Sequence, residues 1–260
     1  MFKFEYKELD FAHKLDNATS PEDQYTKHMH AFVEILFFVS GQVTYNVEGE
    51  KRVLKPGDCV LIQPGKLHFA QVNHDILYER YVLKFPEKFI PKHMKSFFLH
   101  STPFFRISQD GTNLFKSLDI YYQMVNDEDM EIICFSKLME LFVLLKNSHE
   151  KEQSYDRSSV VTEITEYIQN HLCENLSLSK ISKDLSYSES YISSYFKKEM
   201  HTPIMKYIRT KKIIYAHSLV SEGAKPYEVC EKLNFNDYST FYRQYLKVVG
   251  VAPSSHPKKK

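Results

Sequence analysis

Hydrophobic and polar residues alternate with a period of two in the first part of the chain, between about residues 28 and 85. The clearest alternation covers residues 43–47, and a turn-like Glu-Gly-Glu follows at 48–50. Pro-Gly turn signals stand on both sides of the apolar run 59–62. Short strands separated by turns at this spacing are typical of a small antiparallel barrel or sandwich.

From about residue 112 to residue 146 the apolar period changes to that of a helix. Apolar residues recur at intervals of three and four on both sides of a polar stretch at 125–130, which indicates an antiparallel helix pair. Such a pair packs either onto the barrel or onto its copy in a second subunit. The pattern leaves both open, and we favour a homodimer.

The stretch 147–159 holds one aromatic and no aliphatic residue, so it is the best candidate for a linker. The chain of 260 residues is long enough for two domains. We therefore expect one domain at 1–146, with its helices at about 112–146, the linker at 147–159, and a second domain at 160–257.

The second domain contains an internal repeat. Residues 178–198 and 227–247 each read as a short helix, a polar turn and a second helix, which is the pattern of a helix-turn-helix motif. Ser188 and Asp237 can cap the second helices. In the first copy we expect Tyr191 to face inward. The second helix of such a motif enters the major groove of DNA, and its outward residues are Glu189, Ser190, Ser193, Ser194 and Lys197 in the first copy and Tyr238, Ser239, Tyr242 and Arg243 in the second.

A third helix, expected from Pro203 to about Glu222, joins the two copies. About 20 residues at 1.5 Å each give roughly 30 Å, close to the roughly 34 Å between successive major grooves on one DNA face. A single chain could then read an asymmetric site. Four basic residues on this helix are predicted to be available for phosphates or solvent: Lys206, Arg209, Lys211 and Lys212.

Charge and composition add three points. Residues 157–260 carry 16 basic and 10 acidic residues, whereas the rest of the chain carries 18 basic and 23 acidic residues. The positive charge of the second half suits a polyanionic partner, although Lys258–Lys260 supply half of its excess. The content of 43% hydrophobic residues excludes a disordered or fibrous chain. Widely spaced cysteines and the absence of a long apolar run or a signal-peptide profile predict a cytoplasmic protein.

The helical residues resemble the paired helix-turn-helix domain of AraC/XylS-type transcription regulators, over about 95 residues that end in Gly250-Val-Ala-Pro253. Some positions depart from the pattern: Asn234 and His201 replace glycines, and His256 replaces a tyrosine. Asn and His tolerate a left-handed backbone better than most residues, while the change at His256 puts the last helix in doubt. The resemblance implies a DNA-binding regulator with an effector-binding barrel.

In the first domain, His28, His30 and Glu34, followed by Gly41, Gly57 and His68, resemble the two motifs of a cupin barrel. Similar barrels use three His and one Glu to hold iron, manganese or zinc, whereas AraC-type barrels commonly use them as effector pockets. Three interpretations remain open: a polar effector site, a bound metal, and purely structural histidines. The resemblance also points to Arg80, as a partner of Glu34 or of a ligand carboxylate or in a surface ion pair.

Together these features predict an α+β protein, in which a cupin-like antiparallel β-barrel with an appended helix pair precedes an all-α domain with two helix-turn-helix motifs. We expect a transcription regulator with no cofactor, for which double-stranded DNA, a small-molecule effector and RNA polymerase are the candidate partners. Aromatic residues fit a sugar effector, and they are Phe32, Phe37, Phe38, Tyr45, Phe69, Tyr78 and Tyr81. The alternative is a metal-dependent cupin enzyme with a DNA-binding appendage, but no catalytic motif supports it.

Overall fold

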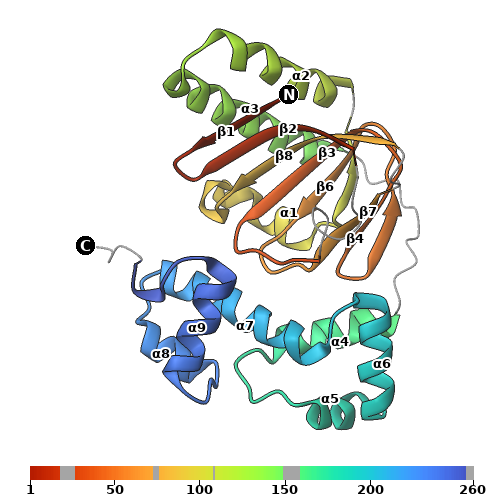
Figure 1. Cartoon of the computed structure of the whole chain (residues 1–260), viewed down its shortest axis with the longest axis vertical. Helices are drawn as coiled ribbons and strands as arrows, with labels where there is room; N and C mark the ends of the chain where they lie inside the picture. Colours follow the sequence, from red (N-terminus) through yellow and green to blue (C-terminus); the bar gives the residue numbers. More distant parts are fainter. Residues whose placement is uncertain (18–26, 73–75, 108, 149–158, 256–260) are drawn as a thin grey trace.

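A computed structural model describes residues 1–17, 27–72, 76–107, 109–148 and 159–255. A domain of strands and helices lies against an elongated helical domain (Figure 1). The predicted α+β fold class is confirmed. Among the described residues no helix is both long and apolar enough to cross a membrane.

Two antiparallel sheets form the barrel of the first domain. The six-stranded sheet has the order β1-β2-β8-β3-β6-β9, and the three-stranded sheet has the order β5-β4-β7. The strands are β1 (Phe2–Tyr6), β2 (Leu9–Asn17), β3 (Val33–Ser40), β4 (Val43–Val47), β5 (Glu50–Val53), β6 (Asp58–Ile62), β7 (His68–Val72), β8 (Leu77–Phe85) and β9 (Phe104–Arg106). The barrel therefore extends beyond the predicted region 28–85, because β1, β2 and β9 complete the edges of the larger sheet.

The larger sheet buries both of its faces. On β3, Leu36 and Phe38 point into the core between the two sheets, whereas Ile35 and Phe37 point into the core against the helices. A strand that is covered on both sides reads as a continuous apolar run, which explains the unbroken sequence from Ile35 to Val39.

Helices cover the outer face of this sheet (Figure 1). They are the short η1 (Glu87–Phe89), η2 (Lys92–Met94) and α1 (Lys95–His100), followed by α2 (Gln109–Met124) and α3 (Asp127–Asn147). Asn126 caps α3 by accepting a hydrogen bond from the backbone N–H of Asp129. Phe115 of α2 and Phe142 of α3 are fully buried against the sheet. The helix pair thus packs onto its own barrel.

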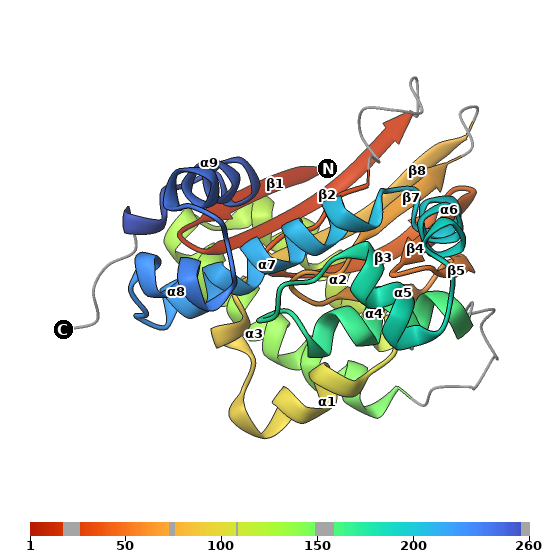
Figure 2. The same cartoon turned by 90° about the horizontal axis from the view of Figure 1, so that it is seen from below.

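The second domain is entirely helical. Its helices are α4 (Ser159–Asn170), α5 (Leu178–Leu185), α6 (Glu189–Met200), α7 (Ile204–Ser221), α8 (Pro226–Lys232), α9 (Tyr238–Val249) and the short η3 (Pro253–Ser255). Helices α5 and α6 form the first predicted helix-turn-helix motif, and α8 and α9 form the second. They lie at opposite ends of α7 (Figure 2).

The prediction that Lys211 and Lys212 of α7 are available for phosphates is wrong, because both are buried. Lys212 donates hydrogen bonds of 2.8 Å to the backbone carbonyls of Glu174, before α5, and Leu233, after α8. One ammonium group therefore joins the two halves of the helical domain. Lys206 and Arg209 are exposed, as predicted.

Replacing Lys212 with Met should lower the free energy of unfolding by about 1–3 kcal/mol, because two carbonyls lose their donor in a buried place. Urea unfolding followed by circular dichroism measures the change. Lys206→Met, on the exposed side of the same helix, is the matched control and should change stability by less than about 0.5 kcal/mol. Equal effects of the two variants would contradict the bridging role of Lys212.

Candidate functional site

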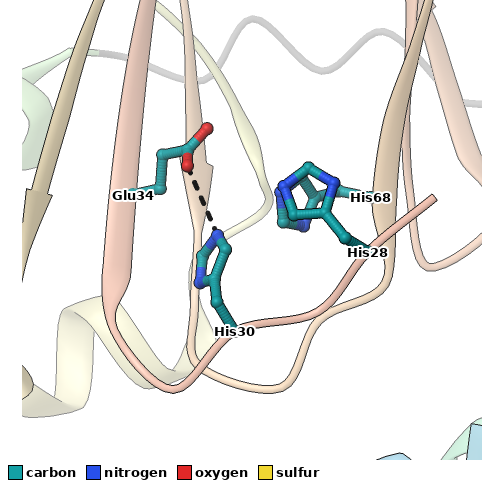
Figure 3. Close-up of side chains that lie close together, drawn as sticks. All are labelled: His28, His30, Glu34 and His68. Carbon is teal, nitrogen blue, oxygen red and sulfur yellow. Dashed lines mark ion pairs between the residues drawn. The ribbon is translucent and has the colours of Figure 1, made fainter. Parts of the chain in front are cut away.

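Four polar side chains converge at one end of the barrel (Figure 3). Glu34 lies on β3, His68 begins β7, and His28 and His30 belong to the segment before β3. The backbones of His28 and His68 form an antiparallel bridge, with N···O distances of 3.2 and 3.1 Å. Each residue offers one ligand atom, and these atoms lie within 4.8 Å of one another. The predicted set of three histidines and one glutamate is thus brought together, and we call it the His/Glu cluster.

Backbone carbonyls orient two of the imidazole rings. The Nδ1 atom of His30 lies 2.9 Å from the carbonyl oxygen of Phe32, and that of His68 lies 2.9 Å from the carbonyl of Lys66. A carbonyl only accepts, so in each ring Nδ1 carries a proton, and Nε2 of His68 presents a lone pair. Both Nε2 atoms are buried without a hydrogen-bond partner in the protein. That of His68 is therefore available to a ligand, whereas that of His30 faces the Glu34 carboxylate.

The cluster combines the carboxylate of Glu34 with the neutral imidazole of His68. Burial by itself would raise the pKa of Glu34, but the contact with His30 and the neighbouring histidine charges outweigh it and hold this pKa at about 2. The Nε2 atom of His30 lies 3.4 Å from Oε2 of Glu34. Burial lowers the pKa of His68 to about 3, and His28 adds to this effect. At neutral pH, Glu34 is thus ionised and His68 is uncharged.

This donor set fits a transition metal. Imidazole nitrogens with one carboxylate suit zinc, iron or manganese, and carbonyls that hold the far nitrogen of each ring are the usual support of metal-bound histidine. The same groups can accept hydrogen bonds from the hydroxyls of an organic effector. The geometry is compatible with both of the ligand-binding interpretations of the sequence.

Arg80 does not pair with Glu34, which corrects one of the predicted roles. Its guanidinium forms an ion pair of 2.6 Å with Asp16, donates to the carbonyl of Tyr78 and stacks on the Tyr78 ring at 4.1 Å. Asp16 lies on β2, the neighbour of β8, and β8 places Arg80 opposite Phe38 of β3. The β3 residue opposite Arg80 is therefore four positions along the strand from Glu34.

The aromatic residues that suggested a sugar are divided among several surroundings. Phe38, Tyr45 and Tyr78 belong to the core between the sheets, and Phe32 stacks on His30 with ring centroids 3.8 Å apart. The other three, which are Phe37, Tyr81 and Phe69, belong to the core against the helices or contact His201 of the helical domain. Three of the seven thus lie between the two sheets, and Phe32 adjoins the His/Glu cluster.

Both predicted recognition helices begin with a side-chain cap. Ser188 accepts a hydrogen bond from the backbone N–H of Tyr191, and Asp237 accepts one from Thr240. The predicted DNA-contacting residues are exposed or half-buried on α6 and α9. Tyr191 was expected to face inward but is 40% exposed, and it stacks on Tyr195. The spacing of aromatic residues in the sequence did not indicate that the Tyr191 side chain is exposed.

The residues that replace glycines adopt the left-handed conformation that the sequence led us to expect. His201 ends α6 with φ 52°, and Asn234 follows α8 with φ 53°. The Asn234 side chain also donates a hydrogen bond of 2.6 Å to the carbonyl of Cys173. His256 lies outside the described residues.

One polar residue was missed as a candidate. The sequence marks 48–50 only as a turn, yet Glu48 is buried against the helical domain, where its carboxylate accepts a hydrogen bond from Tyr207. A glutamate in a turn is ordinarily exposed, so the local pattern contained no sign of this contact.

Comparison with known proteins agrees with this architecture. Residues 15–129 match the model of the AraC-like ligand binding domain, and residues 181–258 match that of a helix-turn-helix domain. The HTH-type transcriptional regulator YobQ of Bacillus subtilis is 26% identical over 88% of this chain and 87% of its own. The arabinose operon regulatory protein of Escherichia coli is 23% identical over 83% and 77%.

Among solved structures, wild-type ToxT from Vibrio cholerae with bound unsaturated fatty acid is 13% identical over all of both chains, with a TM-score of 0.42. The two family matches, one to each domain, and the two relatives that span most of the chain agree on one family. The protein belongs to the AraC family of DNA-binding transcription regulators and carries the ligand-binding domain of that family.

Proposed function

We propose that this regulator responds to a small-molecule effector bound by His28, His30, Glu34 and His68, and that it has no catalytic activity. The observation that carries the proposal is the buried Nε2 atom of His68, which has no hydrogen-bond partner in the protein, beside an ionised Glu34. A sugar is our first choice, because hydroxyls complement these acceptors and the Phe32 ring adjoins them. Titration calorimetry with a panel of monosaccharides tests this assignment, and absence of heat from all of them would contradict it.

Arg80 is proposed as a second contact inside the barrel. Tyr45 lies on β4, and its pKa is raised by burial and by the charge of Glu34 but lowered in part by Arg80. The pKa of the Tyr45 hydroxyl thus responds to the charges of both Glu34 and Arg80. A ligand that extends from the His/Glu cluster along the barrel would reach Arg80, which would contact a polar group at its other end.

For DNA recognition we propose that α6 and α9 occupy successive major grooves. Helix α7 has 18 residues and is about 27 Å long, which suits this spacing. The proposed base and backbone contacts are Glu189, Ser190, Ser193, Ser194, Lys197, Tyr238, Ser239, Tyr242 and Arg243. Lys206 and Arg209 would contact phosphates.

We further propose a cytoplasmic homodimer that contacts RNA polymerase, with domain limits at 1–146, 147–159 and 160–257. Support for the dimer comes from α3, whose outer side exposes Ile132 (67%) and Phe135 (42%). Both residues line a mainly apolar pocket of about 400 Å³ with Tyr6, Leu9 and Phe89. A second copy of the chain would cover this apolar surface.

A second candidate function is metal-dependent control of transcription. The metal would be held by the four residues of the His/Glu cluster, in which Phe32 and Lys66 carbonyls fix two of the rings. A bound metal supplies coordination positions for effector oxygens. The protein's part is to hold Glu34 ionised and His68 neutral, as ligation requires.

Specific DNA binding is the central test. A duplex selected by the protein from a random pool should bind about 1,000-fold or more tightly than random duplex at physiological salt. Arg243→Ala should weaken this binding by about 1–3 kcal/mol and relax discrimination at one base pair. Fluorescence anisotropy across a salt series measures both effects.

Lys92→Ala, at an exposed site of the first domain, is the control for charge removal and should leave affinity unchanged. If Arg243→Ala weakens all sequences uniformly, the residue contacts phosphate. No preference for any duplex at any salt concentration would eliminate the DNA-binding proposal.

Zinc binding tests the second candidate. Purified protein freed of metal should bind one Zn²⁺ per chain in equilibrium dialysis, and His30→Ala should weaken this binding at least about tenfold because it removes a ligand. His93→Ala removes an exposed histidine of the same domain and should have no effect. Equal binding by both variants would place the metal elsewhere, and no binding by the wild type would end the metal proposal.

The dimer proposal predicts that Ile132→Glu shifts the protein toward monomers in sedimentation velocity, because it places a charge in the apolar contact. Lys146→Glu introduces the same acidic group at an exposed position near the end of α3 and serves as the control. A dimer that resists Ile132→Glu, or a monomeric wild type, would contradict the proposed interface.

A further inference from the structure

The barrel meets the helical domain at the turn between β4 and β5. Glu48 occupies this turn with φ 51° and is only 6% exposed. Its Oε2 atom accepts a hydrogen bond of 2.6 Å from the Tyr207 hydroxyl and lies 3.5 Å from Nζ of Lys211. Its Oε1 atom accepts a hydrogen bond of 2.7 Å from the backbone N–H of Leu67. One carboxylate thus links two segments of the barrel to α7.

The charges in this contact depend on one another. Lys211 is 5% exposed and Tyr207 is fully buried. Burial by itself would raise the pKa of Glu48, but Lys211, Lys66 and the Tyr207 hydroxyl outweigh it and lower the pKa. Burial lowers the pKa of Lys211, which the Glu48 charge opposes. Removing one partner of such a pair leaves the other charge buried and uncompensated, which is strongly unfavourable.

The surroundings of Glu48 show that the two surfaces fit each other closely. Gly49 has φ +87°, and a Cβ atom there would lie 3.1 Å from Val161 and 3.4 Å from Met200 of the helical domain. Leu67 inserts its side chain into the core formed by α4, α6 and α7. The turn at 48–49 therefore packs against the helical domain in one arrangement.

The same segment reaches the His/Glu cluster. The backbone N–H of Glu48 donates a hydrogen bond of 2.8 Å to the carbonyl of Leu67. The N–H of Leu67 in turn donates to the Glu48 carboxylate, so Glu48 binds both backbone polar groups of Leu67. His68 follows directly, and its ring belongs to the cluster. Two adjacent residues thus place one side chain in the core of the helical domain and the other in the ligand-binding cluster.

We propose that Glu48 acts as an interdomain latch, in which its contacts with Tyr207 and Lys211 fix the orientation of α7, and with it both recognition helices, relative to the barrel. This inference goes beyond the proposed function and requires neither a particular effector nor DNA. Release of the latch would leave both domains folded but free to reorient.

The full-length chain tests the latch in two measurements. The first is the distance distribution between spin labels on Cys173, which is exposed, and on a cysteine introduced by Lys55→Cys on the barrel. Cys59, Cys134 and Cys230 are buried, and burial raises the pKa of each thiol, which disfavours their labelling. The second measurement is calorimetric unfolding.

The wild type should give one narrow distance and one cooperative transition. Glu48→Gln should broaden the distance distribution and separate the unfolding into two transitions about 5 °C or more apart. Lys51→Ala, which removes the ion pair between Lys51 and Glu199 at the rim of the same interface, should behave as the wild type because Lys51 is exposed and the pair is long, at 3.4 Å.

A conservative pair of variants covers the case in which Glu48→Gln fails to fold. Tyr207→Phe removes only the hydroxyl that contacts Glu48 and should broaden the distance distribution. Tyr245→Phe removes an equally buried hydroxyl whose partner, His217, lies within the helical domain, and it should leave the distance narrow. Narrow distances and a single transition in both Glu48→Gln and Tyr207→Phe would overturn the latch. Because no DNA or effector is added, this outcome is independent of the tests above.

Discussion

The larger sheet must bury both of its faces, and this constraint determines where polar groups can lie in the first domain. Its outer face is covered by α1–α3, and its inner face packs on the smaller sheet. A polar side chain on this sheet therefore needs a polar partner, as His13 has in Asp119 and Glu79 and Arg80 has in Asp16, or a place near a strand end. Glu34 and His68 lie at such ends, where the preceding segment supplies His28 and His30. The position of the His/Glu cluster follows from the way this barrel is closed.

Much of the architecture could be predicted because local signals agreed with the tertiary structure. The alternation at 43–47, the helical period at 112–146 and the repeat around α6 and α9 each correspond to observed elements. The caps Ser188 and Asp237 were also predictable, since short polar side chains satisfy the first backbone N–H groups of a helix. The four members of the His/Glu cluster were found because their motif spacing resembles that of cupins.

The features that could not be predicted are those in which a charged side chain is buried by a distant part of the chain. Lys211 and Lys212 lie on a helix whose pattern marks them as exposed, and only packing against Glu48 and two carbonyls explains their burial. Arg80 pairs with Asp16 because β2 lies beside β8. The predicted strands lay between about residues 28 and 85, so β2 was not among the expected neighbours of β8.

The contact at Glu48 also determines how costly separation of the two domains would be. An interface made only of aliphatic side chains gains nothing when water enters, whereas a carboxylate and an ammonium group recover strong hydration on exposure. The loss of their mutual attraction is thereby largely compensated. Two domains joined in this way can be tightly packed and still separate at a modest cost in free energy. The binding free energy of a small molecule is of a similar size.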